Sequence, residues 1–172
     1  RILAEWQKVK DSGAAGLIGL DVDQNGKLIG KELPDSELIN AASLLCVPGM
    51  GDKKYVVRND LLRTVAPMPV FAGEKNFNPH YLIIKLSKQY RLHPVNQCFC
   101  LVEYQPDGMT ANIWKQYVNS PRSFAELRRV IMDVPGLTWQ YQIKNIVHYC
   151  SSSQIAGNKN YIRESPKKLL TV

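Results

Sequence analysis

Apolar residues recur every three or four positions in several stretches of the chain, which is the spacing of one face of an α-helix. In the first stretch, Ile2, Trp6 and Val9 predict a helix over residues 2–11. Apolar spacing or a capping residue predicts further helices over Pro34–Val47, Leu61–Val65, His80–Leu92, Ser120–Val134 and Thr138–Cys150. The stretch from His80 is also rich in strand-forming residues, so a strand remains the alternative there.

Two other stretches alternate between apolar and polar positions, which is typical of β-strands with one buried face. Leu17–Leu33 alternates on both sides of Asp23–Gly26, whose Asn-Gly pair accepts the positive φ angles of a tight hairpin turn. Gln97–Gln105 and Met109–Val118 flank a second turn sequence, Pro106–Gly108. The sequence therefore predicts two β-hairpins.

Helices and hairpins follow one another without the regular βαβ succession of a doubly wound sheet, which favours an α+β fold. We predict one compact α+β domain over residues 1–150, with two β-hairpins packed against four or five helices. A short basic strand is also predicted at Tyr55–Arg58. Beyond this domain the composition changes to Ser, Gly, Asn and Lys, so residues 151–172 are predicted to form a flexible basic C-terminal extension or linker.

The composition limits the class of protein. The 172 residues are 45% apolar and carry 22 Lys or Arg against 15 Asp or Glu, a formal net charge of +7. No segment approaches the roughly 18 apolar residues of a membrane span, so we expect no membrane partner. The four cysteines lie mostly in apolar segments, so we expect free thiols and an intracellular, cytoplasmic or nuclear, location. Because the chain begins with Arg1, we expect the remainder of a larger chain around it.

One segment carries oxygen ligands at the spacing of a calcium loop. Asp21, Asp23 and Asn25 stand at its first, third and fifth positions, Gly26 at the sixth and Glu32 at the twelfth. The segment resembles the EF-hand calcium loop over all twelve positions, which implies that these four oxygen-bearing side chains hold calcium. The alternative is a hairpin turn without a cofactor. In that case Asp, Asn and Gly are present only because their backbones readily adopt turn conformations.

The apolar run that ends at Asp21 suggests a second metal hypothesis. It resembles the first strand and turn of RNase H-like nucleases, which implies a magnesium ion held by the strand-borne Asp21 and further carboxylates such as Glu103, Asp107 or Asp133. A zinc site is a third hypothesis, and its candidate ligands are His93, Cys98, Cys100, His148 and Cys150. No nucleophile elbow or phosphate loop is present, so we name no catalytic residue and favour a protein that is not an enzyme.

Clustered cations beside aromatic residues give the leading functional hypothesis. The residues expected to contact nucleic acid are Lys53, Lys54, Tyr55, Arg58, Lys85, Lys88, Tyr90 and Arg91. On a helix, Lys85, Lys88 and Arg91 would form one stripe along a phosphate backbone, and the tyrosines would stack on bases. We therefore expect a nucleic-acid-binding or assembly domain of a larger protein.

A protein–protein interaction module is the main alternative. Its docking surface would be an apolar helix face, either Leu38, Ala42 and Leu45 or Ile143 and Val147. The metal-dependent nuclease with Asp21 is the enzymatic alternative.

Overall fold

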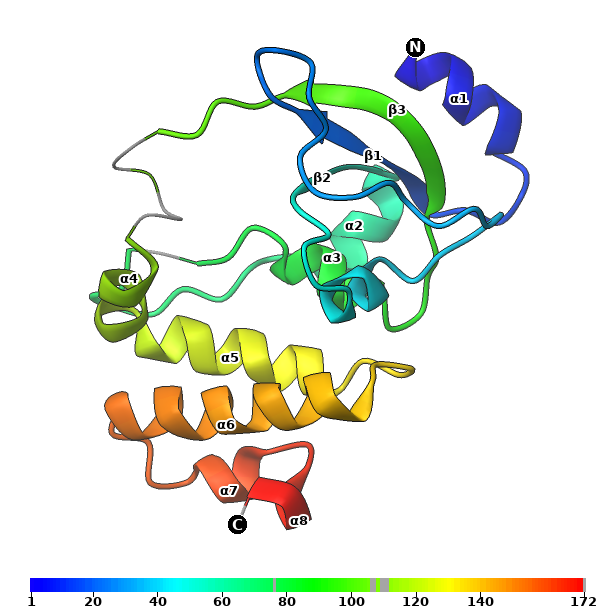
Figure 1. The fold of residues 1–172 in the computed structure, drawn as a ribbon. Coiled ribbons are helices and arrows are strands. Elements are labelled where there is room, and N and C mark those ends of the chain that lie inside the picture. Colours follow the sequence, from blue (N-terminus) through cyan, green and yellow to red (C-terminus); the bar gives the residue numbers. More distant parts are fainter. Residues whose placement is uncertain (76, 106–107, 109–111, 172) are drawn as a thin grey trace. The chain divides into compact units, whose positions relative to one another are not determined.

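The computed structural model describes residues 1–75, 77–105, 108 and 112–171, and in this part the fold contains both helices and a sheet (Figure 1). This confirms the mixed α+β class. The chain divides into two compact units. The first, here called the sheet unit, comprises residues 1–66 and 89–104, and the second, the helical unit, comprises residues 67–88 and 105–172. None of the described helices is long and apolar enough to cross a membrane.

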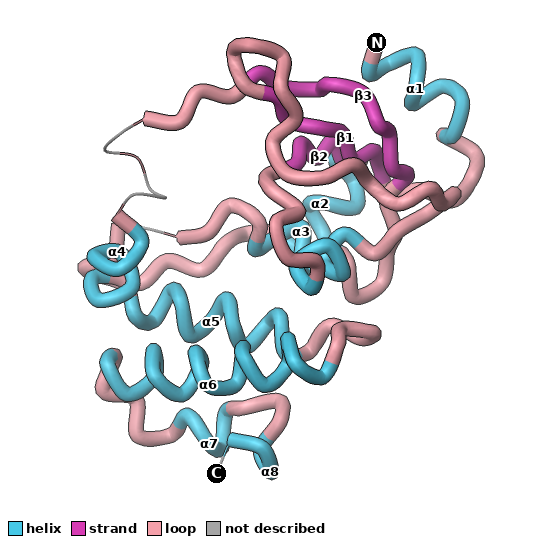
Figure 2. Tube along the Cα trace, viewed as in Figure 1, coloured by secondary structure: helices cyan, strands magenta, loops and turns pink. Residues whose placement is uncertain are grey.

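The sheet has three strands in the described chain: β1 (Gly16–Val22), β2 (Lys53–Val57) and β3 (His93–Leu101), in the order β2-β1-β3 (Figure 2). β1 runs antiparallel to β2 and parallel to β3, with Ile18 opposite Tyr55 on one side and Pro94 on the other. Every residue of β1 is buried. A nearly continuous apolar sequence is what a central strand covered on both faces requires.

The first predicted hairpin is wrong beyond its turn. The chain turns at Asp23–Gly26 as expected, but only the single bridge between Val22 and Leu28 follows, and the antiparallel partner of β1 is β2. The reason lies at Gly30, which has a positive φ and packs against the backbone of Met50, while the neighbouring Lys31 donates its N–H to the Met50 carbonyl. Beyond Ile29, which still donates its N–H to the Asp21 carbonyl of β1, the second arm is thus bound to the loop before β2.

The second predicted hairpin is also wrong. Its first arm overlaps β3, which pairs in parallel with β1, and its second arm contains a helix, α4 (Ile113–Asn119). Most of the predicted turn lies outside the described residues. Tertiary contacts fix the helix, because the Tyr117 hydroxyl donates to the carbonyl of His148 at 2.9 Å and accepts from Ser152 Oγ at 2.7 Å.

Three short helices accompany the sheet. The predicted first helix is confirmed as α1 (Ile2–Val9), and the predicted short helix as α2 (Asn59–Val65). The helix predicted from Pro34 is only a 3₁₀ helix, η1 (Ala41–Cys46), which begins late because Asn40 caps it by accepting the Ala42 N–H at 3.0 Å.

In the helical unit, α5 (Pro121–Met132) packs along α6 (Trp139–Ile155), as both apolar patterns predict. The preceding helix, α3 (Tyr81–Leu86), is shorter than predicted. The last residues of the predicted helix, from position 89, belong to the sheet unit. There Leu92 bridges to Ile39 and β3 begins.

The C-terminal residues are helical, whereas the sequence predicts a flexible extension. α6 runs past Cys150, and α7 (Tyr161–Glu164) and α8 (Lys168–Thr171) follow it. Three of the serine residues that suggest a linker, Ser152, Ser153 and Ser165, are buried, and Ser165 Oγ is hydrogen-bonded to Thr171 Oγ1 at 2.7 Å. Small polar side chains can therefore mark close helix packing as well as a linker.

Candidate functional site

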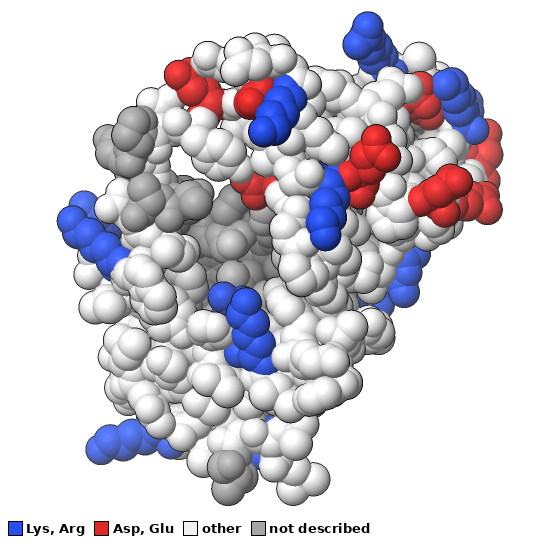
Figure 3. Space-filling model, viewed as in Figure 1, with Lys and Arg blue, Asp and Glu red and all other residues white. Residues whose placement is uncertain are grey.

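The net charge of the chain belongs to one unit. The sheet unit contains ten Lys or Arg and ten Asp or Glu, whereas the helical unit contains twelve Lys or Arg and only five Asp or Glu. The formal excess of +7 is therefore that of the helical unit. On the face drawn in Figure 3, the visible acidic side chains gather over the sheet unit.

Of the predicted nucleic-acid contacts, Lys53 is buried and Tyr55 is half-buried. Lys53 is 4% exposed, and its Nζ donates to three backbone carbonyls, the nearest that of Met50 at 2.5 Å. Burial lowers the pKa of Lys53, against the opposing effect of Asp21 and Asp52. Burial also raises the pKa of Tyr55 to about 12. We leave both residues out of the surface proposed below.

The other predicted residues of the sheet unit lie nearer the surface. Lys54 is exposed, and Arg58 is exposed but pairs with Asp60 at 2.7 Å. Tyr90 and Arg91 are half-buried, and Arg91 Nη1 donates to the Tyr90 carbonyl at 3.0 Å. These cations occupy a unit whose acidic side chains equal its basic ones in number.

The expected stripe of Lys85, Lys88 and Arg91 does not form on one helix. α3 ends before Lys88, and Arg91 belongs to the other unit. Lys85 lies over the Tyr81 ring, 5.6 Å from its centroid, and Lys88 pairs with Asp133. The three cations therefore offer no single line of charge.

The segment that resembles a calcium loop is held as a turn. Asp21 is buried in β1, whereas the carboxylate of Asp23 accepts the backbone N–H groups of Asn25 and Lys27 at 2.9 and 2.8 Å. Glu32 is exposed. Within the described residues, no group of three or more His, Cys, Asp or Glu side chains could hold a metal ion.

The residues of the magnesium and zinc hypotheses are divided between the units. Asp21 and Glu103 belong to the sheet unit and Asp133 to the helical unit, while Asp107 lies outside the described residues. Cys98, Cys100 and His93 also belong to the sheet unit, whereas His148 and Cys150 lie on α6. The described cysteines are free thiols, and His93 Nδ1 lies 2.8 Å from the carbonyl oxygen of Glu37.

The helical unit exposes an apolar stripe on α6. Trp139, Ile143 and Val147 follow one another at intervals of four, and they are 68%, 48% and 61% exposed. This spacing places them on one face of the helix. Of the two apolar faces proposed from the sequence for docking, this one is exposed, whereas Ala42 of the other is buried.

A basic edge lies beside this stripe. Lys144 and His148 are one helical turn apart on α6, and Arg128 of α5 donates to Asn145 Oδ1 at 3.0 Å. Burial lowers the pKa of His148, and the positive charges of Arg128 and Lys144 lower it further. We call the stripe together with Lys144 and His148 the α6 surface: Trp139, Ile143, Val147, Lys144 and His148; the guanidinium of Arg128 is bonded to the buried Asn145 and is not part of it.

The sequence pattern alone did not bring these residues together. Lys144 stands out only weakly among 22 cations, and Trp139 has the spacing of a core position. The signal that could have found part of this surface is the pair of an apolar and a basic residue, Ile143-Lys144, that is repeated one helical turn later as Val147-His148.

Comparisons with protein-family models, with curated proteins and with solved structures found no match to this chain.

Proposed function

We propose that the helical unit binds nucleic acid and that the α6 surface is the contact. The observation that carries this proposal is the confinement of the +7 excess to the helical unit. A polyanion is attracted by such an excess because bound phosphates release their condensed counterions. The separation of charge between units gives the attraction a definite location.

The chemistry of the α6 surface favours a single strand. The exposed Lys144 supplies positive charge for phosphates, and Trp139, two-thirds exposed, offers an open indole face. Bases stack on aromatic side chains with little dependence on sequence, but only if they are not already stacked in a duplex. We therefore expect single-stranded RNA or DNA to bind more tightly than a duplex of the same length.

A salt titration with a fluorescent single-stranded oligonucleotide tests the proposal. Lys144→Gln is expected to weaken binding several-fold and to reduce the slope of log affinity against log salt by about 1. Lys54→Gln is the matched control, because it removes one exposed positive charge from the sheet unit. Equal weakening by both variants, or no binding at low salt, would contradict the proposal.

His148 gives a second measurement of the same contact. Since the nearby cations Arg128 and Lys144 help to lower its pKa, bound phosphates should raise it, and so should Lys144→Gln without ligand. An NMR titration of this imidazole measures both effects. A pKa of His148 that stays constant on saturation with oligonucleotide would place the contact elsewhere.

A protein-interaction function is the second candidate, and the exposed apolar stripe favours it. Three large apolar side chains on one helix face are a common docking element for another protein. The titration above separates the two functions if Ile143→Ser is included. That variant should weaken a protein complex that depends on the stripe equally at low and high salt, whereas its effect on oligonucleotide binding should leave the salt dependence, which Lys144→Gln reduces, in place.

A further inference from the structure

Two of the three tryptophans of the chain are exposed, and both lie in the helical unit. Trp139 at the start of α6 is 68% exposed, and Trp114 of α4 is 79% exposed. The third, Trp6 of α1, belongs to the sheet unit and is half-buried. Tryptophan is on average highly buried in folded proteins, because its large ring buries much apolar area. Two open indole rings in the positively charged unit are therefore candidates for contact with a ligand.

Helix α4 borders the α6 surface at His148. The Tyr117 and His148 rings pack with 6.0 Å between their centroids, and the Tyr117 hydroxyl donates to the His148 carbonyl at 2.9 Å. Figure 1 shows α4 near the end of the α5–α6 pair where α5 begins and α6 ends. Trp114 stands three residues before Tyr117, so both side chains project from the same side of α4. The Trp114 indole therefore lies about one helical turn from the contact between α4 and α6.

Trp139 and His148 lie at opposite edges of the exposed face of α6. They are nine residues apart, which is about two and a half turns and about 14 Å along the helix axis. Lys144 lies between them and is exposed. A ligand that contacts both Trp139 and Trp114 must therefore cross this face obliquely, past Lys144 and His148, and must be longer than about 14 Å.

No acidic residue lies on the two helices along this path. Neither α4 nor α6 contains Asp or Glu, and Lys115 directly follows Trp114 at an exposed position. Neither Lys115 nor Lys144 forms an ion pair with any residue that the structure describes. The two helices therefore present positive charge alone, which attracts an anionic ligand.

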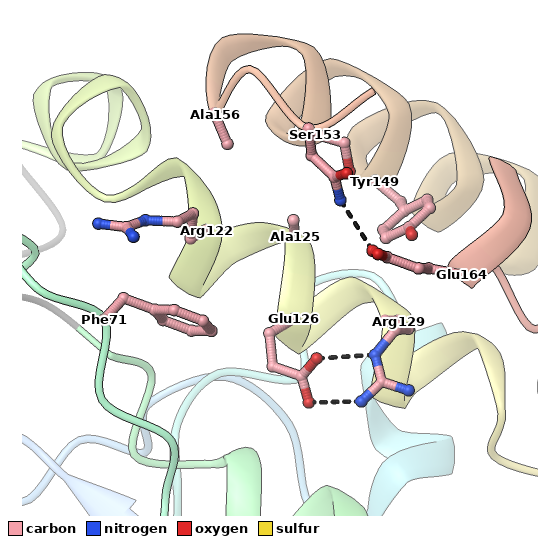
Figure 4. A pocket seen from close by; sticks show the side chains of 10 residues that line it. Phe71, Arg122, Ala125, Glu126, Arg129, Tyr149, Ser153, Ala156 and Glu164 are labelled. Atoms are coloured by element: carbon pink, nitrogen blue, oxygen red, sulfur yellow. Dashed lines mark hydrogen bonds and ion pairs between the residues drawn. The ribbon is translucent and has the colours of Figure 1, made fainter. Parts of the chain in front are cut away.

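The acidic side chains that are described elsewhere in the helical unit are bound to neighbouring groups. These residues are Glu74, Glu126, Asp133 and Glu164. Figure 4 shows two of these contacts, those of Glu126 and Glu164, beside a cavity between α5, α6 and α7. Their charges compensate cations of other elements, so the charges of Lys115 and Lys144 remain available to a ligand.

An exposed indole and an exposed lysine occur together on both helices, which matches the alternation of base and phosphate in a single strand. Bases stack on aromatic rings, and phosphates bind lysines. We propose that Trp114 and Lys115 extend the α6 surface into one continuous site, in which a single strand stacks one base on Trp139 and another on Trp114. The inference rests on the function proposed above and adds a second stacking position, which sets a minimum length for the nucleic acid.

A length series of oligothymidylates, bound to the full chain at low salt, tests the inference. Trp114→Leu should weaken binding of a decathymidylate about fivefold or more, the usual loss when a stacking side chain is removed. A dithymidylate is too short to contact both indoles, so the same variant should weaken its binding by about twofold at most. Trp114→Phe keeps an aromatic ring and should retain most of the affinity. Val118→Ser is the matched control, since Val118 is an exposed apolar residue of α4 without a ring.

Tryptophan fluorescence gives a second measurement, which leaves Trp114 in place. Three variants each keep one tryptophan and have the other two replaced by phenylalanine. Saturation with decathymidylate should quench the emission of Trp114 and of Trp139, because a base stacked on an indole quenches its fluorescence. The emission of Trp6, which lies in the sheet unit, should stay unchanged.

Failure of this inference and failure of the proposed function give different results. The inference is overturned if the emission of Trp114 stays unchanged at saturation. It is also overturned if Trp114→Leu and Val118→Ser weaken decathymidylate binding equally, because the ring would then have no special role. The proposed function would still hold in either case if Trp139 is quenched and Lys144→Gln reduces the salt dependence. No binding at low salt would contradict both.

Discussion

At the scale of single residues, Gly19 on β1 is a position where the lack of space for a side chain requires glycine. A Cβ built on this glycine would lie 2.2 Å from Cγ of Phe99, whose ring covers the strand at this point. Lys54 and Val95 are its neighbours across the sheet. The backbone of Gly19 has no positive φ, so the requirement comes from the close approach of the ring.

Gly19→Ala should therefore lower the free energy of unfolding by about 1–3 kcal/mol, the usual cost of overpacking a tight contact. Urea denaturation measures the change. In the Phe99→Ala background the same substitution should cost much less, because the ring that meets the new methyl group is gone. Equal costs in the two backgrounds would show that Phe99 is not the obstacle.

At the scale of elements, the start of α5 depends on a residue far away in the sequence. The side chain of Ser120, at the N-cap, makes no capping hydrogen bond. The carboxylate of Glu74 instead accepts the backbone N–H groups of Arg122 and Ser123, at 2.9 and 2.8 Å, and the Ser123 hydroxyl at 2.6 Å. A carboxylate at a helix N-terminus also interacts favourably with the helix dipole. Glu74 thus attaches the segment before α3 to α5.

Glu74→Gln should lower the free energy of unfolding by about 1–2 kcal/mol at neutral pH, since it removes the charge from these hydrogen bonds. Glu37→Gln, at an exposed position, is the matched control. Burial alone would raise the pKa of Glu74, but the hydrogen bonds from Ser123 and Arg122 lower it overall.

The lowered pKa predicts the pH dependence. The stabilising effect of Glu74 is fully present above the ordinary glutamate pKa of about 4.3 and is lost as the pH falls through the lowered value in the folded state. Urea denaturation at several pH values should show the difference between wild type and Glu74→Gln shrinking on acidification. A difference independent of pH would mean that the carboxylate charge does not contribute.

At the scale of the whole molecule, the two units differ in charge and should differ in their response to salt. The helical unit carries the entire excess of +7, so its like charges repel one another, whereas the basic and acidic residues of the sheet unit are equal in number.

Raising the ionic strength from a low value should therefore slow hydrogen exchange more in α5 and α6 than in β1, because salt screens the repulsion in the helical unit. Mass spectrometry of peptides from the three elements measures this. An equal change in all three, or a larger one in β1, would contradict the expectation.

Much of the local structure could be predicted from the sequence, because it depends on neighbours along the chain. The apolar spacings predicted helices over residues 2–11 and Ser120–Val134, which the structure confirms as Ile2–Val9 and Pro121–Met132, and the Asn-Gly pair predicted the turn after β1. The candidate site was harder to predict from the sequence. The stripe of Ile143 and Val147 could be named as a docking face, but its exposure depends on which side of α6 packs against α5.

The sequence by itself determined the mixed class, the positions of most helices and the size of the positive charge, since these follow from composition and from contacts within a few residues. Only the tertiary structure decided the pairing of β1 with β2 and β3, the helical form of α4 and of the C-terminal residues, and the division of the charge between two units. Those features depend on contacts between residues far apart in the chain, such as Gly30 with Met50 and Tyr117 with His148, and such contacts can override local preference.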